Sequence, residues 1–364
     1  MTHVVMEAQS LSSVAAGSGT GTYVRHLLAE LAHDPTLSMT ALCAPGATLP
    51  DGIGRLTVRR LAQRPRLELM ENSVRLPVER VLSRPHGAVF HNPGFHAPPA
   101  LRSPWVQTLH DLIPLRFNAP DIAALRARWK RFAPRYRKAD AVIAISQHSA
   151  DEGIALLGLD PAKVHVAHHG IDPRYCVGGG TDADEAPYLL VVSEYSRRKG
   201  FAEAFAVLDA LADAGYPHRL VVAGQVHAAV RDELEALHAA AKYPERIEIS
   251  GFVPDLIALY QGATAYLMTS RYEGFGFPAL EAMACGVPVV AFDNTAMPEV
   301  VGDAGALVAD GDAVAMTEAV RQVLDSTALA AERRAQGIER AAHFTWARSA
   351  AIHAEVYRSV AAAS

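Results

Sequence analysis

Short apolar runs alternate with amphipathic stretches through almost the whole chain. In the first half, residues 4–8, 87–91, 105–110 and 141–146 are apolar enough to form buried strands, and several of these runs end in a polar residue. Amphipathic stretches such as 23–31 lie between them. This alternation is typical of α/β domains built around parallel sheets, which bind ligands beyond the carboxyl ends of their strands.

A second series of the same kind follows a break in the pattern. Residues 177–187 are rich in Gly and Asp and have no hydrophobic periodicity, which predicts an interdomain linker. The sequence therefore predicts a first domain over 1–176 and a second over 188–344. In the second domain, strands are expected at the apolar runs 188–193, 219–224, 247–249, 265–268 and 287–291.

Composition agrees with a soluble two-domain protein. The chain has 364 residues, of which 50% are hydrophobic and 20% charged. No apolar run approaches the roughly 20 residues of a membrane span. The amino terminus lacks the features of a signal peptide. The three cysteines, Cys43, Cys176 and Cys285, show no metal-ligand spacing. We therefore expect a cytoplasmic protein.

The net charge of −5 conceals a strongly basic segment. Residues 55–138 contain 17 Lys and Arg against 5 Asp and Glu. No nucleic-acid recognition motif accompanies this charge, so nucleic acid is not an expected partner. An anionic membrane surface or a phosphorylated acceptor fits better.

Part of this segment, 116–138, has an apolar stripe at helical spacing. Leu125, Trp129, Phe132 and Tyr136 recur at steps of three and four residues with cations between them. The ordinary interpretation is a core-facing helix with a solvated basic back. The alternative is peripheral attachment to anionic lipid at the inner membrane face. Pro134 is expected to kink or split the helix.

The most informative segment is 271–290, Arg-Tyr-Glu-Gly-Phe-Gly-Phe-Pro-Ala-Leu-Glu and onward. It predicts a glycine-rich turn, a short helix and a buried strand, and a helix start of this kind favours a bound anion. If helix joined Glu273 to Glu281, they would be about 12 Å apart along its axis, too far for a paired acid and base. They are expected to contact different parts of one elongated ligand, such as a nucleotide diphosphate sugar.

This Glu-x7-Glu segment resembles the signature of family 4 of the retaining glycosyltransferases, which have the GT-B fold. The resemblance extends over Ala284–Val290 and Pro298–Val301. It implies two doubly wound Rossmann-like domains facing across a cleft, with the first binding the acceptor and the second the nucleotide sugar. It also implies that a C-terminal helix at about 345–364 packs back on the first domain.

The resemblance assigns roles to individual residues. Glu273 is expected beside the donor sugar and Glu281 at the ribose hydroxyls. Lys199 is expected to contact the diphosphate. The chain has Ser193-Glu194 where many relatives have Gly-Arg, so Arg198 or Arg197 is expected to supply the second cation. The expected donor contacts are Gly19, Thr20, Gly21, Arg198, Lys199, Gly224, Phe252, Val253, Glu273, Gly274, Phe275, Gly276, Phe277, Leu280 and Glu281.

Three residues of the first domain complete the expected site. His110 follows a buried strand within a His-Asp-Leu segment that is similar to one of the family. A histidine at a strand end is more often structural, but the resemblance implies that His110 contacts the sugar and acts with Lys199 and Glu273 in catalysis. His91 and Asp111 are the expected acceptor contacts.

No metal or cofactor is expected. Asp182-x-Asp184 and Asp310-x-Asp312 imitate a metal-binding Asp-x-Asp but fall in a linker and a glycine-containing turn. Lys, Arg and a helix start can neutralise a leaving diphosphate instead. The expected reaction moves a hexose from a GDP- or UDP-sugar to a hydroxyl of a lipid-linked sugar, polysaccharide or small metabolite. A sugar-nucleotide epimerase, a phosphorylase and a non-catalytic sugar-nucleotide binder remain alternatives.

Overall fold

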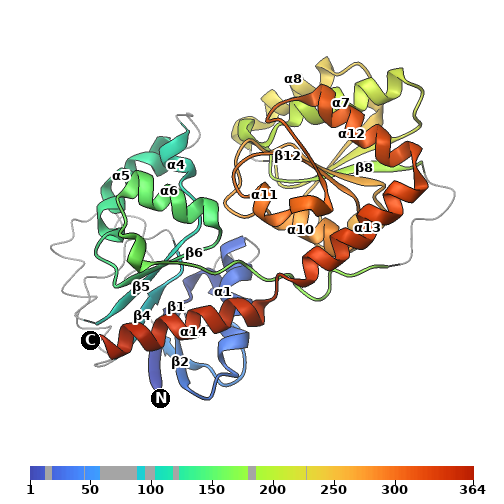
Figure 1. The fold of residues 1–364 in the computed structure, drawn as a ribbon. Helices are drawn as coiled ribbons and strands as arrows, with labels where there is room; N and C mark the ends of the chain where they lie inside the picture. Colours follow the sequence, from blue (N-terminus) through green and yellow to red (C-terminus); the bar gives the residue numbers. More distant parts are fainter. Residues whose placement is uncertain are drawn as a thin grey trace. The chain divides into compact units, whose positions relative to one another are not determined.

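A computed structural model describes residues 1–12, 19–44, 46–57, 88–94, 103–117, 123–178, 186–226 and 228–364. The chain divides into two compact units (Figure 1). Unit 1 contains Met1–Gly170 together with Thr345–Ser364, and unit 2 contains Ile171–Phe344. Most of the predicted linker, residues 179–185, lies outside the described part of the chain.

Unit 1 is built on a parallel sheet of seven strands in the order β3-β2-β1-β4-β5-β6-β7. Because β1 lies between β2 and β4, Val4 is opposite Met39 on one side and Val89 on the other. These inner strands are buried, as their apolar residues predict. The strands are β1 (Thr2–Glu7), β2 (Leu37–Cys43), β3 (Gly54–Thr57), β4 (Val89–Asn92), β5 (Trp105–Leu109), β6 (Ala141–Ala144) and β7 (Val164–Val166).

The C-terminal helix of unit 1 lies beside the first helix against this sheet (Figure 1). It contacts β1, β4, β5 and β6, and it buries Trp346, His353 and Tyr357. The helices described in unit 1 are α1 (Gly19–Leu31), α4 (Ile113–Arg116), α5 (Ala123–Tyr136), α6 (Gln147–Leu157) and α14 (Trp346–Ala362), with the 3-10 turns η1 (Gln9–Ser12) and η5 (Pro161–Lys163).

Unit 2 has a second parallel sheet, in the order β10-β9-β8-β11-β12-β13. Its strands are β8 (Tyr188–Val192), β9 (Arg219–Ala223), β10 (Ile247–Gly251), β11 (Ala265–Met268), β12 (Val289–Phe292) and β13 (Ala306–Val308). Its helices are α7 (Phe201–Asp213), α8 (Arg231–Ala240), α9 (Ile257–Gly262), α10 (Phe277–Ala284), α11 (Met297–Val300), α12 (Ala313–Asp325) and α13 (Thr327–Ala342), with 3-10 turns η6 (Arg197–Lys199), η7 (Ala228–Val230), η8 (Pro244–Arg246) and η9 (Gly302–Ala304).

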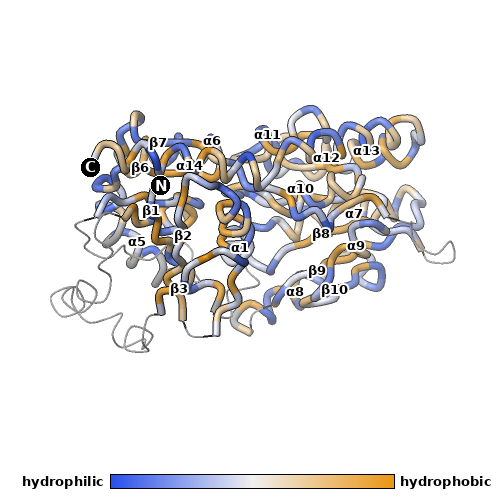
Figure 2. The backbone as a smooth tube through the Cα atoms, turned by 90° about the horizontal axis from the view of Figure 1, so that it is seen from below, coloured by the Kyte–Doolittle hydropathy of each residue, from blue (hydrophilic) through white to orange (hydrophobic). Residues whose placement is uncertain are grey.

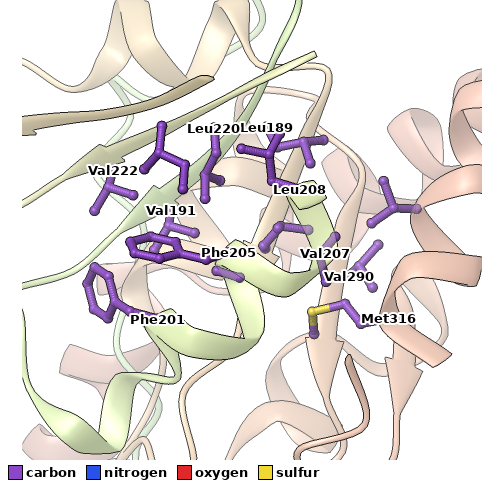
Figure 3. Close-up of a cluster of buried hydrophobic side chains, with 14 of the residues drawn as sticks. Leu189, Val191, Phe201, Phe205, Val207, Leu208, Leu220, Val222, Val290 and Met316 are labelled. Atoms are coloured by element: carbon purple, nitrogen blue, oxygen red, sulfur yellow. The ribbon is translucent and has the colours of Figure 1, made fainter. Parts of the chain in front are cut away.

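The core of unit 2 forms where α7 packs on the sheet. Phe201, Phe205 and Leu208 of α7 lie against the side chains of β8 and β9 in one buried cluster (Figure 3). Helix α12 joins this cluster through Met316 and Val320. Along α12 and α13 hydrophobic and hydrophilic positions alternate (Figure 2), as expected for helices with one face on the core.

Four strands lie outside the predicted apolar runs. The outer strands β3, β7 and β13 are at most partly buried, so they need no continuous apolar sequence. Strand β2, Leu-Ser-Met-Thr-Ala-Leu-Cys, mixes polar and apolar residues and pairs with β1 and β3. These strands become recognisable only through their partners.

Of the two effects expected of Pro134, splitting of the basic helix does not occur. Helix α5 continues through Pro134 and ends at Tyr136, so it is not split. A proline this close to the end removes only one of the last hydrogen bonds. Trp129 and Tyr136 are buried and their rings stack with centroids 5.3 Å apart. This agrees with the core-facing interpretation, while contact of 116–138 with anionic lipid stays a prediction.

Candidate active site

The candidate site in unit 2 is centred on a buried ion pair between Lys199 and Glu273. Lys199 Nζ lies 2.5 Å from Glu273 Oε1, and the two side chains are only 11% and 13% exposed. Burial opposes ionisation of Glu273, but the charges of Lys199 and Arg198 and the hydrogen bond from Lys199 outweigh it and lower its pKa. Glu273 is therefore an anion held by a cation, not a proton donor at neutral pH.

Backbone geometry fixes Lys199 in this place. Lys199 ends the η6 turn after β8, and Gly200 follows in the left-handed conformation with φ of 65°. A Cβ atom on residue 200 would lie 2.0 Å from the carbonyl oxygen of Thr269, so the chain requires glycine here. The Thr269 hydroxyl in turn donates a 2.8 Å hydrogen bond to the Lys199 carbonyl.

Arg198 supplies a second cation with unused hydrogen-bonding capacity. Its side chain is 19% exposed, and Nη2 lies 3.5 Å from Glu194 Oε1. Nη1 is buried and has no hydrogen-bond partner within the described residues. Buried guanidinium nitrogens normally have an acceptor, so this nitrogen favours a bound anion.

The turn before α10 brings a helix start to the same region. Gly276 is its N-cap, with φ of 103°, and no side chain caps the helix. A Cβ atom on residue 276 would lie 2.2 Å from Met297 Cε. Phe275 is buried and its ring packs edge to face on Phe277, with centroids 5.4 Å apart. The positive end of the α10 dipole, which favours a bound anion, therefore lies at this turn.

Glu273 and Glu281 do not share one helix, as expected from a glycine-rich turn followed by a short helix. Helix α10 begins at Phe277, so Glu273 lies in the preceding turn and only Glu281 is helical. Glu281 Oε2 instead accepts a 2.8 Å hydrogen bond from the buried Tyr260 hydroxyl. The conclusion that the two carboxylates serve separate purposes is retained, because each has its own partner.

Burial gives Glu281 a different electrostatic state from Glu273. Desolvation raises its pKa to about 7, although hydrogen bonds from Tyr260 and Tyr175 act in the opposite direction. The rings of Tyr175 and Tyr260 meet edge to face with centroids 5.7 Å apart. Glu281 can therefore change protonation near neutral pH.

Three further predicted donor contacts follow strands β9 and β10. Gly224 lies so close to the backbone just after β8 that a Cβ atom would be 1.8 Å from the Ser193 carbonyl oxygen. Its N–H donates to the Gly251 carbonyl over 2.8 Å. Beyond Gly251, Phe252 is 74% exposed and Val253 is partly exposed. An exposed aromatic ring at a strand end offers a stacking surface.

In unit 1, the predicted glycine loop is partly helical. Gly19, Thr20 and Gly21 form the first turn of α1, not a loop, and residues 13–18 lie outside the described part. A helix start can still bind phosphate, so their expected donor contact stays a prediction.

The His91 side chain is buried in unit 1 and forms hydrogen bonds to other residues of that unit. It is 0% exposed, Nε2 lies 2.8 Å from Thr108 Oγ1, and Nδ1 lies 2.6 Å from the Tyr357 hydroxyl. Both ring nitrogens are therefore occupied by protein groups. This arrangement argues against the predicted contact between His91 and an acceptor.

His110 and Asp111 follow β5, as predicted, but both have protein partners. His110 is 7% exposed and its Nε2 donates a 2.6 Å hydrogen bond to the Pro93 carbonyl. Burial lowers its pKa to about 4, so the ring is neutral. Asp111 accepts from the Ile113 N–H over 3.1 Å. Their roles toward sugar and acceptor stay predictions.

Sequence reasoning missed a buried chain of hydrogen bonds that fixes α14 in unit 1. His353 Nδ1 lies 2.7 Å from the Ser349 carbonyl oxygen and must donate to it. Burial lowers the pKa of His353 to about 4, so Nε2 is unprotonated and accepts from the Tyr23 hydroxyl at 2.8 Å. The Tyr23 oxygen then accepts from Thr108 Oγ1 at 2.9 Å.

The same chain continues through His91. Because Thr108 donates to Tyr23, it accepts from His91 Nε2, and His91 Nδ1 accepts from Tyr357. The partners thus determine the tautomers of both His91 and His353. Helices α1 and α14 are joined to β4 and β5 by side chains far apart in sequence.

The acidic pairs have structural roles where they are described. Asp310 Oδ1 accepts from Asn294 Nδ2 at 2.8 Å, and Asp312 caps α12 by accepting from the Ala315 N–H. Asp182 and Asp184 lie outside the described residues. Within the described ranges, no group of three His, Cys, Asp or Glu residues is arranged to hold a metal ion. None of the described helices is sufficiently long and apolar to cross a bilayer.

Comparison with known sequences identifies relatives for both units. Residues 17–175 match the family model for Glycosyltransferase Family 4, and residues 180–344 match the model for Glycosyl transferases group 1. O-antigen chain mannosyltransferase B of Escherichia coli is 29% identical over 277 residues, 71% of this chain and 71% of that protein. Alpha-maltose-1-phosphate synthase of Mycolicibacterium smegmatis is 31% identical over 291 residues, 71% of this chain and 74% of that protein.

Solved structures share the fold over the full length of the chain. Sucrose-phosphate synthase from Thermosynechococcus elongatus has a TM-score of 0.80 at 21% identity, covering 100% of both chains. Anabaena HepE, solved in complex with UDP and glucose, has a TM-score of 0.70 at 18% identity, also covering 100% of both chains. At these identities the likeness shows the fold alone.

Proposed function

The chain belongs to family 4 of the glycosyltransferases, which have the GT-B fold, and we propose that it transfers a hexose from a nucleoside diphosphate sugar to a hydroxyl acceptor with retention of configuration. The observation that carries this proposal is the buried Lys199–Glu273 pair, close to an Arg198 nitrogen that has no acceptor within the described residues. The two cations Lys199 and Arg198 beside a helix start can neutralise a diphosphate. The carboxylate of Glu273, which Lys199 holds in place, can accept hydrogen bonds from sugar hydroxyls.

Each group has a proposed role toward the donor. Lys199, Arg198 and the Phe277 end of α10 neutralise the diphosphate, while Glu281 accepts hydrogen bonds from the ribose. Glu273 accepts from hydroxyls of the transferred sugar, and the exposed Phe252 ring stacks on the base. A nucleotide donor is also supported by the UDP in the related Anabaena HepE structure.

The proposed step is substitution on one face of the sugar. The bond from the anomeric carbon to the diphosphate oxygen breaks, and the electron pair stays on the phosphate. The acceptor oxygen bonds to the same face, and its proton passes to the leaving phosphate oxygen. Lys199 and Arg198 stabilise the charge that develops there, so the proposed step requires no metal ion. His110 remains a proposed sugar contact.

A donor panel tests the proposal. UDP-glucose, UDP-galactose and GDP-mannose are offered with and without alkyl glycosides as acceptors, in buffer containing EDTA. We expect at least one donor to raise Tm, because it binds the folded protein, and to be turned over faster with acceptor present. NMR of the product should show the anomeric configuration of the donor.

The same panel separates the alternatives. An epimerase would change the sugar of the nucleotide without acceptor, and a phosphorylase would require inorganic phosphate. A binding protein would raise Tm without turnover. An inverted product would contradict the proposed mechanism while leaving the donor class intact.

The raised pKa of Glu281 predicts a pH-dependent nucleotide affinity. A carboxylate accepts hydrogen bonds from both ribose hydroxyls, whereas the protonated acid loses part of that capacity. With a pKa of about 7, Glu281 ionises as pH rises, so affinity for UDP or GDP should increase between about pH 6 and 8. Calorimetric titration across this range measures the effect.

Two variants separate this effect from titration of the nucleotide phosphate. Glu281→Gln should bind more weakly and lose the part of the pH dependence that belongs to the carboxyl group. Tyr260→Phe removes a hydrogen bond that lowers the pKa of Glu281, so its midpoint should move to higher pH. Identical pH profiles for wild type and Glu281→Gln would disprove the assignment.

A further inference from the structure

Thr295, after strand β12, has an unusual backbone conformation. It has φ of 46°, and it alone among the described residues other than glycine has a positive φ. A β-branched residue is poorly suited to this left-handed region, because its side chain crowds the backbone. Such strain persists only where the surroundings enforce it, and it is concentrated at functional sites.

The hydroxyl of Thr295 contacts the turn that carries the buried carboxylate. The backbone N–H of Glu273 donates a 3.1 Å hydrogen bond to Thr295 Oγ1. Thr295 Oγ1 in turn donates to Asn294 Oδ1 at 3.1 Å. The strained residue therefore holds the backbone of Glu273 directly, and its own hydroxyl is oriented by a neighbour.

Asn294 forms a hydrogen bond to the first residue of the same turn, Ser270. Its Nδ2 donates to the Ser270 carbonyl at 3.0 Å and to Asp310 Oδ1 at 2.8 Å. Arg271, between the two anchored residues, pairs with Glu203 and lies 3.5 Å from Asp310. Residues 270–273 are thus fixed by side chains from helix α7 and from the loops after β12 and β13, and Thr295 is the one that binds the Glu273 backbone within the described part of the chain.

We propose that Thr295 is a positioning residue, which holds the Glu273 backbone so that its carboxylate meets both Lys199 and the transferred sugar. This inference rests on the proposed role of Glu273 toward the donor. The part of it that concerns Thr295 itself is that the strained backbone at residue 295 is retained because the Thr295 hydroxyl fixes the backbone of Glu273. Loss of the hydroxyl should therefore lower transfer more than it lowers the stability of the fold.

Three substitutions at one position separate strain from hydrogen bonding. Thr295→Ser keeps the hydroxyl, Thr295→Val keeps the branched shape without it, and Thr295→Gly relieves the strain and also lacks the hydroxyl. Turnover is followed with UDP-glucose or GDP-mannose, whichever the wild type consumes. We expect Thr295→Ser to stay within about threefold of wild-type kcat, and Thr295→Val and Thr295→Gly to lose about tenfold or more, in the range of a mispositioned catalytic group.

The glycine variant distinguishes positioning from a structural role. We expect Thr295→Gly to keep a Tm close to that of wild type but to have a lower kcat, because relief of strain at positive φ offsets the lost hydrogen bonds of the hydroxyl and the greater freedom of glycine in the unfolded chain. A structural residue would move stability and activity together. Wild-type kcat in Thr295→Gly, or in a folded Thr295→Val, would overturn the proposal.

Amide hydrogen exchange gives a readout that needs no substrate. The Glu273 amide should exchange slowly in wild type and Thr295→Ser, and at least tenfold faster in Thr295→Gly. Unchanged protection would overturn the inference. The variant Glu273→Gln separates the role of Thr295 from the proposed function. Wild-type turnover in Glu273→Gln would contradict both the proposed role of Glu273 and the role of Thr295. Loss of turnover in Glu273→Gln, together with wild-type turnover in Thr295→Val and Thr295→Gly, would contradict only the role of Thr295.

Discussion

Replacing Lys199 with alanine is expected to lower kcat/KM for the nucleotide sugar by about a thousandfold. Loss of one preorganised charge at a developing anion typically costs 10²–10³ in rate, and here Glu273 would also lose its cation. The variant leaves a carboxylate that is 13% exposed without its lysine, so that it keeps the charge of Arg198 and the hydrogen bond from Ser270 but loses the ion pair. Breaking a buried pair in this way costs about 3–5 kcal/mol of stability, so urea unfolding must accompany the kinetics.

Two further variants separate catalysis from folding. Lys242 makes an ion pair of the same 2.5 Å length with Asp213, but both side chains are about half exposed. Lys242→Ala should therefore leave kcat/KM unchanged. The double variant Lys199→Met with Glu273→Gln removes both charges and should recover much of the stability but none of the activity. Recovery of transfer in that variant would show that the pair serves only folding.

Acid is expected to destabilise unit 1 through its buried histidines. Burial lowers the pKa of His110 and His353 to about 4, and it holds the pKa values of His91 and His169 well below their usual range. Each ring is neutral in the fold but binds a proton near pH 6.5 when unfolded. Their contribution to stability is therefore complete above pH 6.5 and is lost as pH falls toward 4.

The expected size is about 1.4 kcal/mol per pH unit for each histidine. Glu7 acts in the opposite direction, because burial raises its pKa to about 7 and the folded state takes up a proton there. The clean measurement is therefore a difference between variants. Between pH 5 and 6.5, the free energy of unfolding in urea should change less steeply with pH in His353→Leu than in wild type. The difference in slope should be about that expected for one histidine.

His353→Leu also removes the acceptor for Tyr23, so it should be less stable than wild type at pH 7.5. Asp34→Asn is a control that removes an ion pair between α14 and the rest of unit 1 without removing a histidine, because Asp34 pairs with Arg358 at the exposed part of α14. The pKa of Asp34 is lowered, mainly by its hydrogen bond from Thr36, so this group titrates below the range measured. Equal slopes for wild type and His353→Leu would contradict the assigned protonation states.

Sequence patterns identified the inner strands β1, β4, β5 and β6 of unit 1 because these strands are largely buried, but they missed the inner strand β2, which mixes polar and apolar residues. Val4 and Val89 lie on paired inner strands of unit 1, and such residues are apolar wherever a parallel sheet is covered by helices. The outer strands β3 and β13 carry no comparable signal, since one edge and part of their side chains face water. Only pairing with a neighbour defines them.

The helix of Glu281 was identified from its glycine, proline and carboxylate spacing, and the comparisons place the whole chain in the family that this segment resembles. Its start at Phe277 was identified as well, because Gly276 and Pro278 are local signals of a turn followed by a helix. The contact of Met297, the first residue of α11, with the turn at Gly276 is not visible in the sequence, because it joins segments that are distant along the chain.

The sequence by itself determined which groups stand at the candidate site: Lys199, Glu273 and Glu281 are recognisable from local motifs, because strand ends and helix starts are local features. Only the tertiary structure decided what each group does there. Lys199 neutralises Glu273, Tyr260 binds Glu281, and His91 is enclosed by Thr108 and Tyr357. Burial and hydrogen bonding depend on residues distant in sequence, and these set the charge of each group.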